Sequence, residues 1–196
     1  MLVWVDCEMT GLDVSKDALI EVAVLVTDAD LNVQGDGVDI IIATPPEALV
    51  AMSDVVTEMH TKSGLLDAIA SSTVTMEEAE QQALDYVKKY VHEAGMAPLA
   101  GNTIGTDRAF LARHMPALEG YMHYRNVDVS TIKELAKRWY PRVFYGAPEK
   151  KSDHRALSDI RESIQELRYY RASVFVPRPG PSGAEVKALA AAFPMT

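Results

Sequence analysis

The amino-terminal part of the chain has three apolar runs of strand length. They are Leu2–Val5, Leu19–Val26 and Val33–Ala43, and all three contain β-branched residues, which favour strands. Thr10–Asp13 and Asp28–Asp30 separate these runs and have the composition of turns. The pattern predicts a meander of strands in which the first strand is central in the sheet and largely buried.

From Pro45 onwards the spacing of apolar residues becomes helical. We expect Thr75 to cap a helix, because Glu77 and Glu78 follow it in the first turn, and we expect Gly95 to end that helix. The apolar stripe of this helix has helical spacing and consists of Ala79, Leu84, Val87 and Val91.

The second half of the chain is predicted to be mainly helical. A short buried run, Ala97–Ala100, leads into one helix, and a long helix runs from about Arg155 to Ser173 after a polar loop at Tyr145–Asp153. Another helix begins near Ser130 and stops at Pro141. Its predicted inner face consists of Ile132, Leu135, Ala136 and Trp139.

Strands followed by helices indicate an α/β sheet covered by helices, in one domain that we place at residues 1–176. Residues 177–196 begin with a Pro- and Gly-rich stretch and end in an alanine-rich segment. We therefore expect a loosely held tail there, and we assign it no function.

Charge limits the partners that such a domain can have. The chain has 196 residues, 48% of them hydrophobic, which is typical of a globular domain and argues against disorder. Its net charge of −9 excludes non-specific binding of long duplex nucleic acid, which depends on neutralised phosphates. Residues 121–171 nevertheless carry a net charge of +4. This asymmetry is equally consistent with a side that faces a polyanion and with solvated helices.

Nothing in the sequence points to oxidation or to a membrane. The only cysteine, Cys7, cannot form an intramolecular disulfide. No apolar run approaches the roughly 18–20 residues of a membrane span, and the first residues lack the basic segment of a secretory signal. We therefore expect a cytoplasmic protein without a membrane partner.

Two carboxylates interrupt the first predicted strand. Asp6 and Glu8 are two residues apart, so the period of a strand places both side chains on the same face of the sheet. Neighbouring ionised groups near a buried strand repel each other, and a divalent cation would neutralise them. Taken alone, the two residues are also consistent with a solvated strand end.

Two further acidic segments follow. Asp107 lies at the amino end of a helix, where the helix dipole favours a carboxylate, and Phe110 and Leu111 would anchor that helix to the core. His154 and Asp159 are five residues apart, which on an ideal helix is a rotation of about 500° and leaves them roughly 140° apart. Asp159 can therefore face the sheet only if His154 precedes the helix. An ordinary helix start and a surface histidine are the structural alternatives.

In combination, these segments resemble the DEDD exonuclease superfamily in its histidine-bearing subgroup. The pattern is Asp-x-Glu in the first strand, then Asn-x₄-Asp-x₂-Phe-Leu, then His-x₄-Asp. The resemblance to the oligoribonuclease family is closer, and it extends from the amino end to about Arg171. Its motifs are Trp4–Asp13, Gly101–Asp107, Asp128–Thr131 and Asp159–Ser163.

The resemblance implies a ribonuclease H-like (DnaQ-like) α/β fold with a mixed sheet flanked by helices. It also implies a 3′–5′ exoribonuclease that hydrolyses very short single-stranded RNAs, dinucleotides above all, to nucleoside 5′-monophosphates. Asp6, Glu8, Asp107 and Asp159 would hold two divalent ions, Mg²⁺ or Mn²⁺, which prefer oxygen ligands and assist in-line displacement at a phosphate. His154 would be the general base, a role that suits the unperturbed histidine pKa of about 6.5.

The resemblance also implies how substrate length is selected. In the family, the base at the scissile end packs on a leucine, here Leu12, and a histidine, here His60, lies by the substrate. A cap of hydroxyls and one arginine closes over the 5′-phosphate and excludes longer chains. The arginine and a neighbouring tyrosine reach across a homodimer interface. The counterparts in this chain are Thr103, Ser130, Thr131, Arg125 and Tyr124.

These cap residues also have structural interpretations. Ser130 and Thr131 could cap a helix, Tyr124 and Arg125 could be a surface pair, and Leu12 could pack in a turn. Such a cap would reconcile the charge of −9 with an RNA substrate, because a short anion needs no basic groove.

The chain departs from the family at two positions. Val55 stands where the family often has an aromatic side chain between the bases, so weaker stacking is expected there. Thr103 replaces the more usual serine and conserves the hydroxyl.

Two other functions compete with the favoured one. The same chemistry could serve a proofreading or trimming exonuclease on DNA or longer RNA 3′ ends, which a 5′-phosphate cap would exclude. A catalytically silent binding module would lack a carboxylate or the histidine, whereas all five are present. The substrates of the favoured enzyme would be remnants of RNA decay or linear dinucleotides from cyclic dinucleotide signalling.

Overall fold

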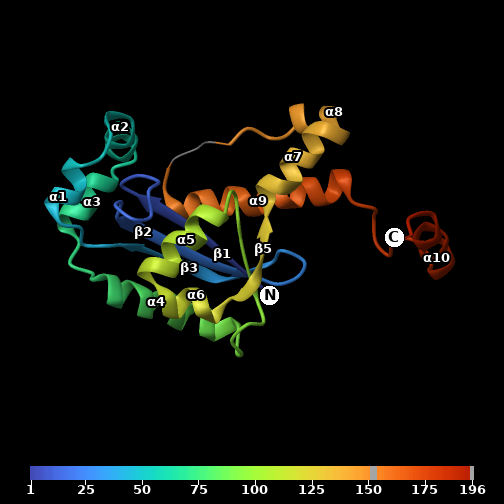
Figure 1. Ribbon diagram of the computed structural model, residues 1–196, viewed down its shortest axis with the longest axis horizontal. Helices are drawn as coiled ribbons and strands as arrows, with labels where there is room; N and C mark the ends of the chain where they lie inside the picture. Colours follow the sequence, from blue (N-terminus) through green and yellow to red (C-terminus); the bar gives the residue numbers. More distant parts are fainter. Residues whose placement is uncertain (151–153, 195–196) are drawn as a thin grey trace.

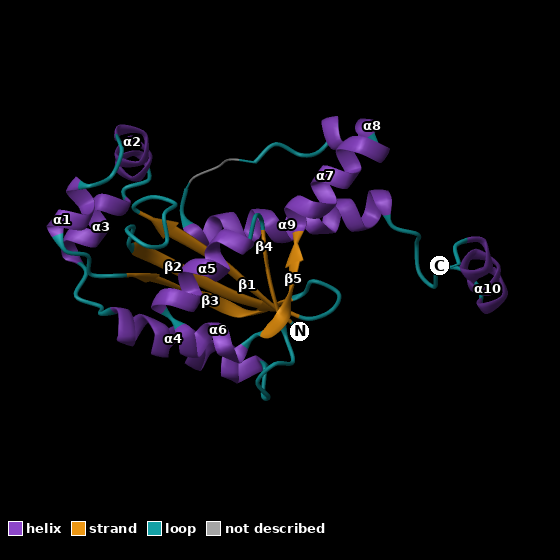
Figure 2. Ribbon diagram, in the orientation of Figure 1, coloured by secondary structure: helices purple, strands orange, loops and turns teal. Residues whose placement is uncertain are grey.

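The computed structural model describes residues 1–150 and 154–194. Its centre is a five-stranded sheet, shown in orange in Figure 2. The strands are β1 (Leu2–Met9), β2 (Leu19–Thr27), β3 (Val33–Ile41), β4 (Pro98–Gly101) and β5 (His123–Asp128). Their order is β3-β2-β1-β4-β5, with β1 antiparallel to β2 and parallel to β4. The first strand is therefore central, as the sequence predicts.

Helices cover both faces of this sheet (Figure 1). On one face, α4 (Met76–Tyr90), α5 (Gly105–His114) and α6 (Pro116–Tyr121) share a core with alternate residues of β1. On the other face, α7 (Val129–Trp139) and α9 (Ala156–Val174) pack with Trp4 and the intervening positions of β2. The result is the mixed α/β sheet flanked by helices that the resemblance implies.

The remaining helices lie outside these two layers. α1 (Pro46–Val50), α2 (Asp54–Lys62) and α3 (Leu65–Ser71) follow β3 and lie together at one end of the sheet, on the left of Figure 1. The short α8 (Pro141–Tyr145) follows α7. Tyr145 therefore belongs to a helix, and the predicted polar loop begins one residue later. Lys151–Asp153 of that loop lie outside the described residues.

The start of α4 is as predicted, but its end is not. The Thr75 hydroxyl accepts the Glu78 N–H at 3.2 Å, and the Glu78 carboxylate accepts the Thr75 N–H at 2.9 Å, which completes a capping box. The helix ends at Tyr90, because Val91 is extended. Gly95 lies in the following loop, where its N–H donates to the Tyr121 carbonyl at 2.9 Å.

The predicted inner face of α7 is only half correct. Ala136 is buried and Ile132 packs against the α9 core, whereas Leu135 and Trp139 are 37% and 66% exposed. Leu135 and Trp139 are four residues apart, so they share a side of the helix, and it is not the side that packs on α9. The apolar pattern identified the apolar positions of this helix, but it did not indicate which of them are buried within the chain.

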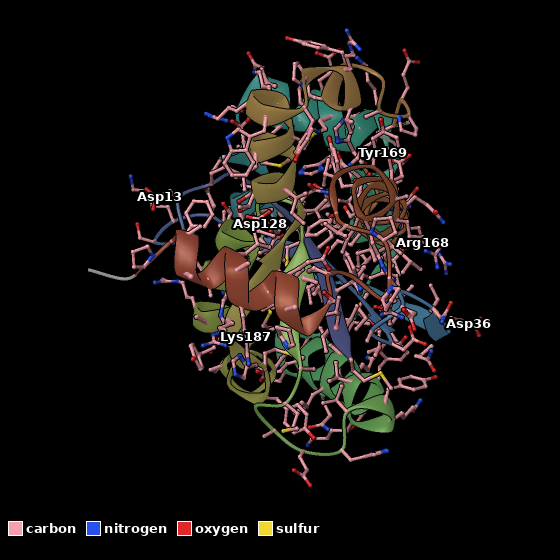
Figure 3. All side chains as sticks on the ribbon, turned by 90° about the vertical axis from the view of Figure 1, so that its right-hand side faces the viewer. Asp13, Asp36, Asp128, Arg168, Tyr169 and Lys187 are labelled. Carbon is pink, nitrogen blue, oxygen red and sulfur yellow. The ribbon has the colours of Figure 1, made fainter. Side chains whose placement is uncertain are left out.

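The tail forms a helix of its own, α10 (Gly183–Ala192), which begins with a capping box at Ser182 and has no buried residue. It lies beyond the carboxyl end of α9 (Figure 1). Figure 3 looks onto this end of the molecule, with α10 and its Lys187 nearer to the viewer than Asp128. Within the described residues, no helix is both long enough and apolar enough to cross a membrane.

Candidate active site

Three carboxylates point from the sheet toward α9. Asp6 pairs across the strands with Ala23, and Glu8 pairs with Glu21. Directly opposed residues share a face of an antiparallel pair, and Ala23 belongs to the core beneath α9. Asp6, Glu8 and Glu21 therefore face α9, at the end of β1 that leads into the first turn.

Asp107 reaches the same strand from a helix. It lies in the first turn of α5 and is only 7% exposed. Its Oδ1 accepts the backbone N–H of Cys7 at 3.0 Å, which ties the carboxylate to β1 between Asp6 and Glu8. Phe110 is fully buried below it and holds the helix in this position.

His154 and Asp159 approach from the opposite side. His154 precedes α9 with a positive φ of 50°, and Asp159 lies in the first turn of that helix. Glu8, His154 and Asp159 each offer one ligand atom, and these atoms all lie within 4.8 Å of one another. The structure thus places His154 before the helix, the arrangement in which Asp159 can face the sheet.

The carboxylates of this cluster are difficult to ionise. Burial, more than any other cause, raises the pKa of Asp6 from 3.8 to about 9 and that of Glu8 from 4.5 to about 8. Repulsion from neighbouring carboxylates adds to both shifts, from Asp107 above all for Asp6 and from Glu21 for Glu8. Burial also raises the pKa of Asp107, to about 6, although the N–H of Cys7 opposes the shift.

This donor set fits divalent cations. Carboxylate oxygens are the preferred ligands of Mg²⁺ and Mn²⁺, and a bound cation would favour the ionised carboxylates, against the burial and repulsion that raise their pKa values. The convergence of Glu8, His154 and Asp159 provides enough donors for an ion beside Asp6 and Asp107.

His60 borders the cluster from α2. It is fully buried, its Nε2 lies 2.9 Å from the Met9 carbonyl, and its Nδ1 lies 3.9 Å from Glu8 Oε2. Because a carbonyl can only accept, Nε2 must carry the proton. Burial lowers the pKa of His60, so the ring is neutral and directs its Nδ1 lone pair toward Glu8.

Two of the predicted cap hydroxyls meet beyond the ends of β4 and β5. Thr103 Oγ1 and Ser130 Oγ are 3.2 Å apart, and the Thr103 N–H donates to Asp128 Oδ1 at 3.0 Å. Asp128 also accepts the Ser130 N–H, and it is the residue that caps α7. The structural interpretation of Ser130 as the helix cap is therefore wrong. Thr131 follows in the first turn and is exposed.

The other predicted substrate residues lie apart from these hydroxyls. Arg125 stacks over the ring of Tyr124 at 5.3 Å, and both are exposed on β5. Arg125 precedes Asp128 by three residues, which is about 10 Å along a strand. Leu12 is 77% exposed in the turn after β1, so it is not a residue packed on the core. Val55 is also exposed, on α2.

Sequence reasoning gave no role to Asn102, which connects the cap hydroxyls to α9. Its Nδ2 donates to Ser163 Oγ at 2.7 Å and to Glu166 Oε2 at 3.1 Å. Its Oδ1 accepts the Ser130 hydroxyl at 2.9 Å.

Glu21 was missed altogether, although a signal existed. It is the only charged residue in the nine residues of β2, all of which are buried.

Comparison with known proteins shows which family the chain belongs to. The profile of the exonuclease family RNase_T matches residues 3–167. An oligoribonuclease from Rhodococcus jostii is 61% identical over 188 residues, which are 96% of this chain and 94% of that protein. An oligoribonuclease from Streptomyces avermitilis is 62% identical over 190 residues, which are 97% and 94% of the two chains.

Solved structures share the fold at much lower identity. Exonuclease I from Methylocaldum szegediense has a TM-score of 0.62 and 19% identity over 88% of this chain. Exonuclease I from E. coli, in complex with a dA16 oligonucleotide, has a TM-score of 0.68 and 13% identity over 88% of this chain. The chain spans 40% and 41% of these two proteins, so the likeness concerns the fold of a part of each protein alone.

Proposed function

The chain belongs to the oligoribonuclease family of exonucleases, and from this premise we propose that it is a 3′–5′ exoribonuclease for the shortest RNAs. Dinucleotides are its main substrates, and nucleoside 5′-monophosphates are the products. Family membership supports the exoribonuclease activity. The preference for dinucleotides rests on the cap residues, and it is the more specific part of the proposal.

The convergence of Glu8, His154 and Asp159 within 4.8 Å, beside the buried Asp107, carries the proposal. Asp6, Glu8, Asp107 and Asp159 would hold two divalent ions, Mg²⁺ or Mn²⁺. Bound there, the ions would stabilise charge on the entering and leaving oxygens of the phosphate.

The protein's own contribution begins with His154. Because this side chain is exposed and borders Glu8 and Asp159, it can take a proton from the attacking water and release it to solvent. His60 supports the substrate side of the cluster, since its Nδ1 faces the site and its ring is held by the Met9 carbonyl. Leu12, exposed in the turn after β1, offers an apolar surface to the base at the scissile end.

The cap at the far end of the substrate needs a second copy of the chain. Thr103, Ser130 and Thr131 supply hydroxyls from one copy, and Arg125 with Tyr124 would come from the other. Exposed apolar side chains on β5, on α7, on α8 and at the junction of the two helices support this association, because such patches mark interaction surfaces. They are Tyr124, Leu135, Trp139, Tyr140 and Tyr145.

An isosteric variant tests the metal cluster. Asp107→Asn retains the oxygen that accepts the Cys7 N–H but loses the charge that a cation needs. We expect release of monophosphates from a 5′-phosphorylated dinucleotide to become undetectable, and Mg²⁺ no longer to raise Tm. Asp85→Asn, on the exposed side of α4, is the control. Appreciable turnover by a folded Asp107→Asn protein would contradict the proposal.

A further inference from the structure

Glu21 is a fully buried carboxylate with no role in the proposed reaction. It lies on β2 directly opposite Glu8, on the face that carries the acidic cluster. A charge in this position is stable only when it is paired and hydrogen-bonded. Its partners therefore indicate what it does.

Both oxygens of Glu21 bind the start of α9. Oε1 accepts hydrogen bonds from Nε of Arg155 at 3.0 Å and from Nη2 at 2.9 Å. Oε2 accepts a hydrogen bond from the backbone N–H of Ala156 at 3.3 Å. Nη2 of Arg155 also lies 3.6 Å from Asp39 on β3. Since both oxygens are engaged by α9, Glu21 is a poor candidate for a further metal ligand.

These contacts replace an ordinary helix cap. Arg155 occupies the N-cap position of α9, and its side chain forms no cap hydrogen bond to the helix backbone. The orphan N–H of Ala156 is instead satisfied by a carboxylate from the sheet, which also suits the positive end of the helix dipole. Glu21 thus fixes where α9 begins relative to β1.

The same anchor fixes the two catalytic-site residues of this segment. His154 is the residue immediately before Arg155 in the chain. Its φ is positive, a backbone conformation that costs energy in a residue other than glycine. The Asp159 N–H donates to the Arg155 carbonyl at 3.0 Å, so the first turn of α9 starts from the anchored residue. Loss of the Arg155 side chain would displace the adjacent His154, whereas Asp159, further along α9, is also held by the packing of that helix on the sheet.

We propose that Glu21, Arg155 and Asp39 form a clamp between the sheet and α9 that positions His154 for proton transfer. This inference depends on the proposed role of His154 as the general base. Glu21, Arg155 and Asp39 are positioning residues and do not themselves contact the substrate. Arg155 is the side chain to test first because it is one-third exposed, so its replacement is compatible with folding. Arg161→Ala is the matched control, since Arg161 also ties α9 to β3 residues, through the Asp36 carbonyl at 2.9 Å.

Steady-state kinetics on a 5′-phosphorylated dinucleotide at saturating Mg²⁺ test the clamp. Arg155→Ala should lower kcat by about tenfold or more, with KM and the half-saturating Mg²⁺ concentration changed by less than about twofold. Arg155→Lys should recover part of the rate. The double variant Glu21→Gln/Arg155→Met removes both charges together, leaves no unpaired buried carboxylate and should show the same kcat loss as Arg155→Ala.

A second comparison separates positioning from a structural role. In a His154→Ala background, Arg155→Ala should lower kcat no further, because its effect passes through the missing imidazole. Full additivity of the two losses would overturn the clamp, as would wild-type kcat in Arg155→Ala. A tenfold rise in half-saturating Mg²⁺ in Glu21→Gln would overturn it in favour of metal ligation. Undiminished activity of His154→Ala, by contrast, would contradict the proposed function itself.

Discussion

Individual carboxylates in this protein are held in an environment that opposes their charge. Asp6 and Glu8 keep pKa values of about 9 and 8 because burial and mutual repulsion penalise ionisation. Strongly shifted carboxyl pKa values are characteristic of functional sites, where a bound cation or substrate stabilises the ionised form.

The pH dependence of stability follows from these shifts. Between the ordinary carboxyl pKa near 4 and the folded values of about 8 and 9, the folded chain retains protons that the unfolded chain releases. Metal-free protein should therefore lose stability as pH rises from 5 to 9. A loss of about 2 kcal/mol would lower Tm by about 4–8 °C in a protein of this size.

Thermal unfolding in EDTA and in Mg²⁺ measures this effect. Mg²⁺ should raise Tm more at pH 8 than at pH 5.5, because cation binding requires deprotonated ligands. The double variant Asp6→Asn/Glu8→Gln should flatten the profile in EDTA and remove the response to Mg²⁺. A Tm of the metal-free wild type that is constant or rises between pH 5 and 9 would contradict the electrostatic account.

At this scale, the spacing of residues in the sequence predicted which side chains the fold brings into the acidic cluster. The two-residue spacing of Asp6 and Glu8 fixes a shared face, and the five-residue spacing of His154 and Asp159 requires one of them to leave the helix. Glu21 could not be given a role in this way, because its partner Arg155 is 134 positions away in the chain. Only the folded sheet brings the two together.

Among the secondary-structure elements, those with strong apolar patterns were predictable and those without were not. β2 is buried along its whole length, and its sequence is a nearly continuous apolar run. α4 begins with a capping box, and its sequence has Thr75 followed by Glu78. β5 was missed because four of its six residues, HYRNVD, are His, Arg, Asn and Asp, and none of the six is fully buried. Its pairing with β4 comes from backbone hydrogen bonds, which leave no apolar signature.

The ends of β4 and β5 carry a prediction about phosphate recognition. Ser130→Ala removes a hydroxyl that contacts both Thr103 and Asn102. We expect it to lower kcat/KM for a 5′-phosphorylated dinucleotide by about tenfold, the value of a charge-assisted hydrogen bond, and to change the unphosphorylated dinucleoside much less. Kinetics on this substrate pair measure the difference.

Ser182→Ala is the control for that measurement, because it removes a serine hydroxyl from the N-cap of α10, away from the cluster. An equal loss on both substrates in Ser130→Ala would show that the hydroxyl supports the fold and not phosphate recognition.

The whole molecule raises the question of what covers the exposed face of α7. Leu135 and Trp139 follow the apolar pattern of a buried helix, yet this chain leaves them exposed. A pattern along one sequence cannot distinguish burial within a chain from burial between two chains. The proposed second copy would cover these side chains and would supply the missing half of the cap.

Mixed dimers test this arrangement directly. Arg125→Ala and His154→Ala should each be deficient on dinucleotides, because one lacks the cap and the other the base. When the two variants are co-expressed, a hybrid dimer would contain one site with an intact His154 and an intact Arg125 from the other copy. Partial recovery of dinucleotide turnover is expected.

Trp139→Glu, which places a charge in the exposed apolar surface, should prevent that recovery and yield monomers in sedimentation. Absence of recovery in hybrids whose dimeric state is verified would contradict a cap shared between copies.

We propose that this exoribonuclease selects its substrates by length, because the cap closes over the 5′-phosphate. The most direct test is a series of 5′-phosphorylated RNAs of two to seven nucleotides, incubated with the protein and Mg²⁺ while monophosphate release is followed. We expect a steep fall in kcat/KM beyond the dinucleotide. Rates that stay equal or rise with length would contradict it and identify a general trimming exonuclease.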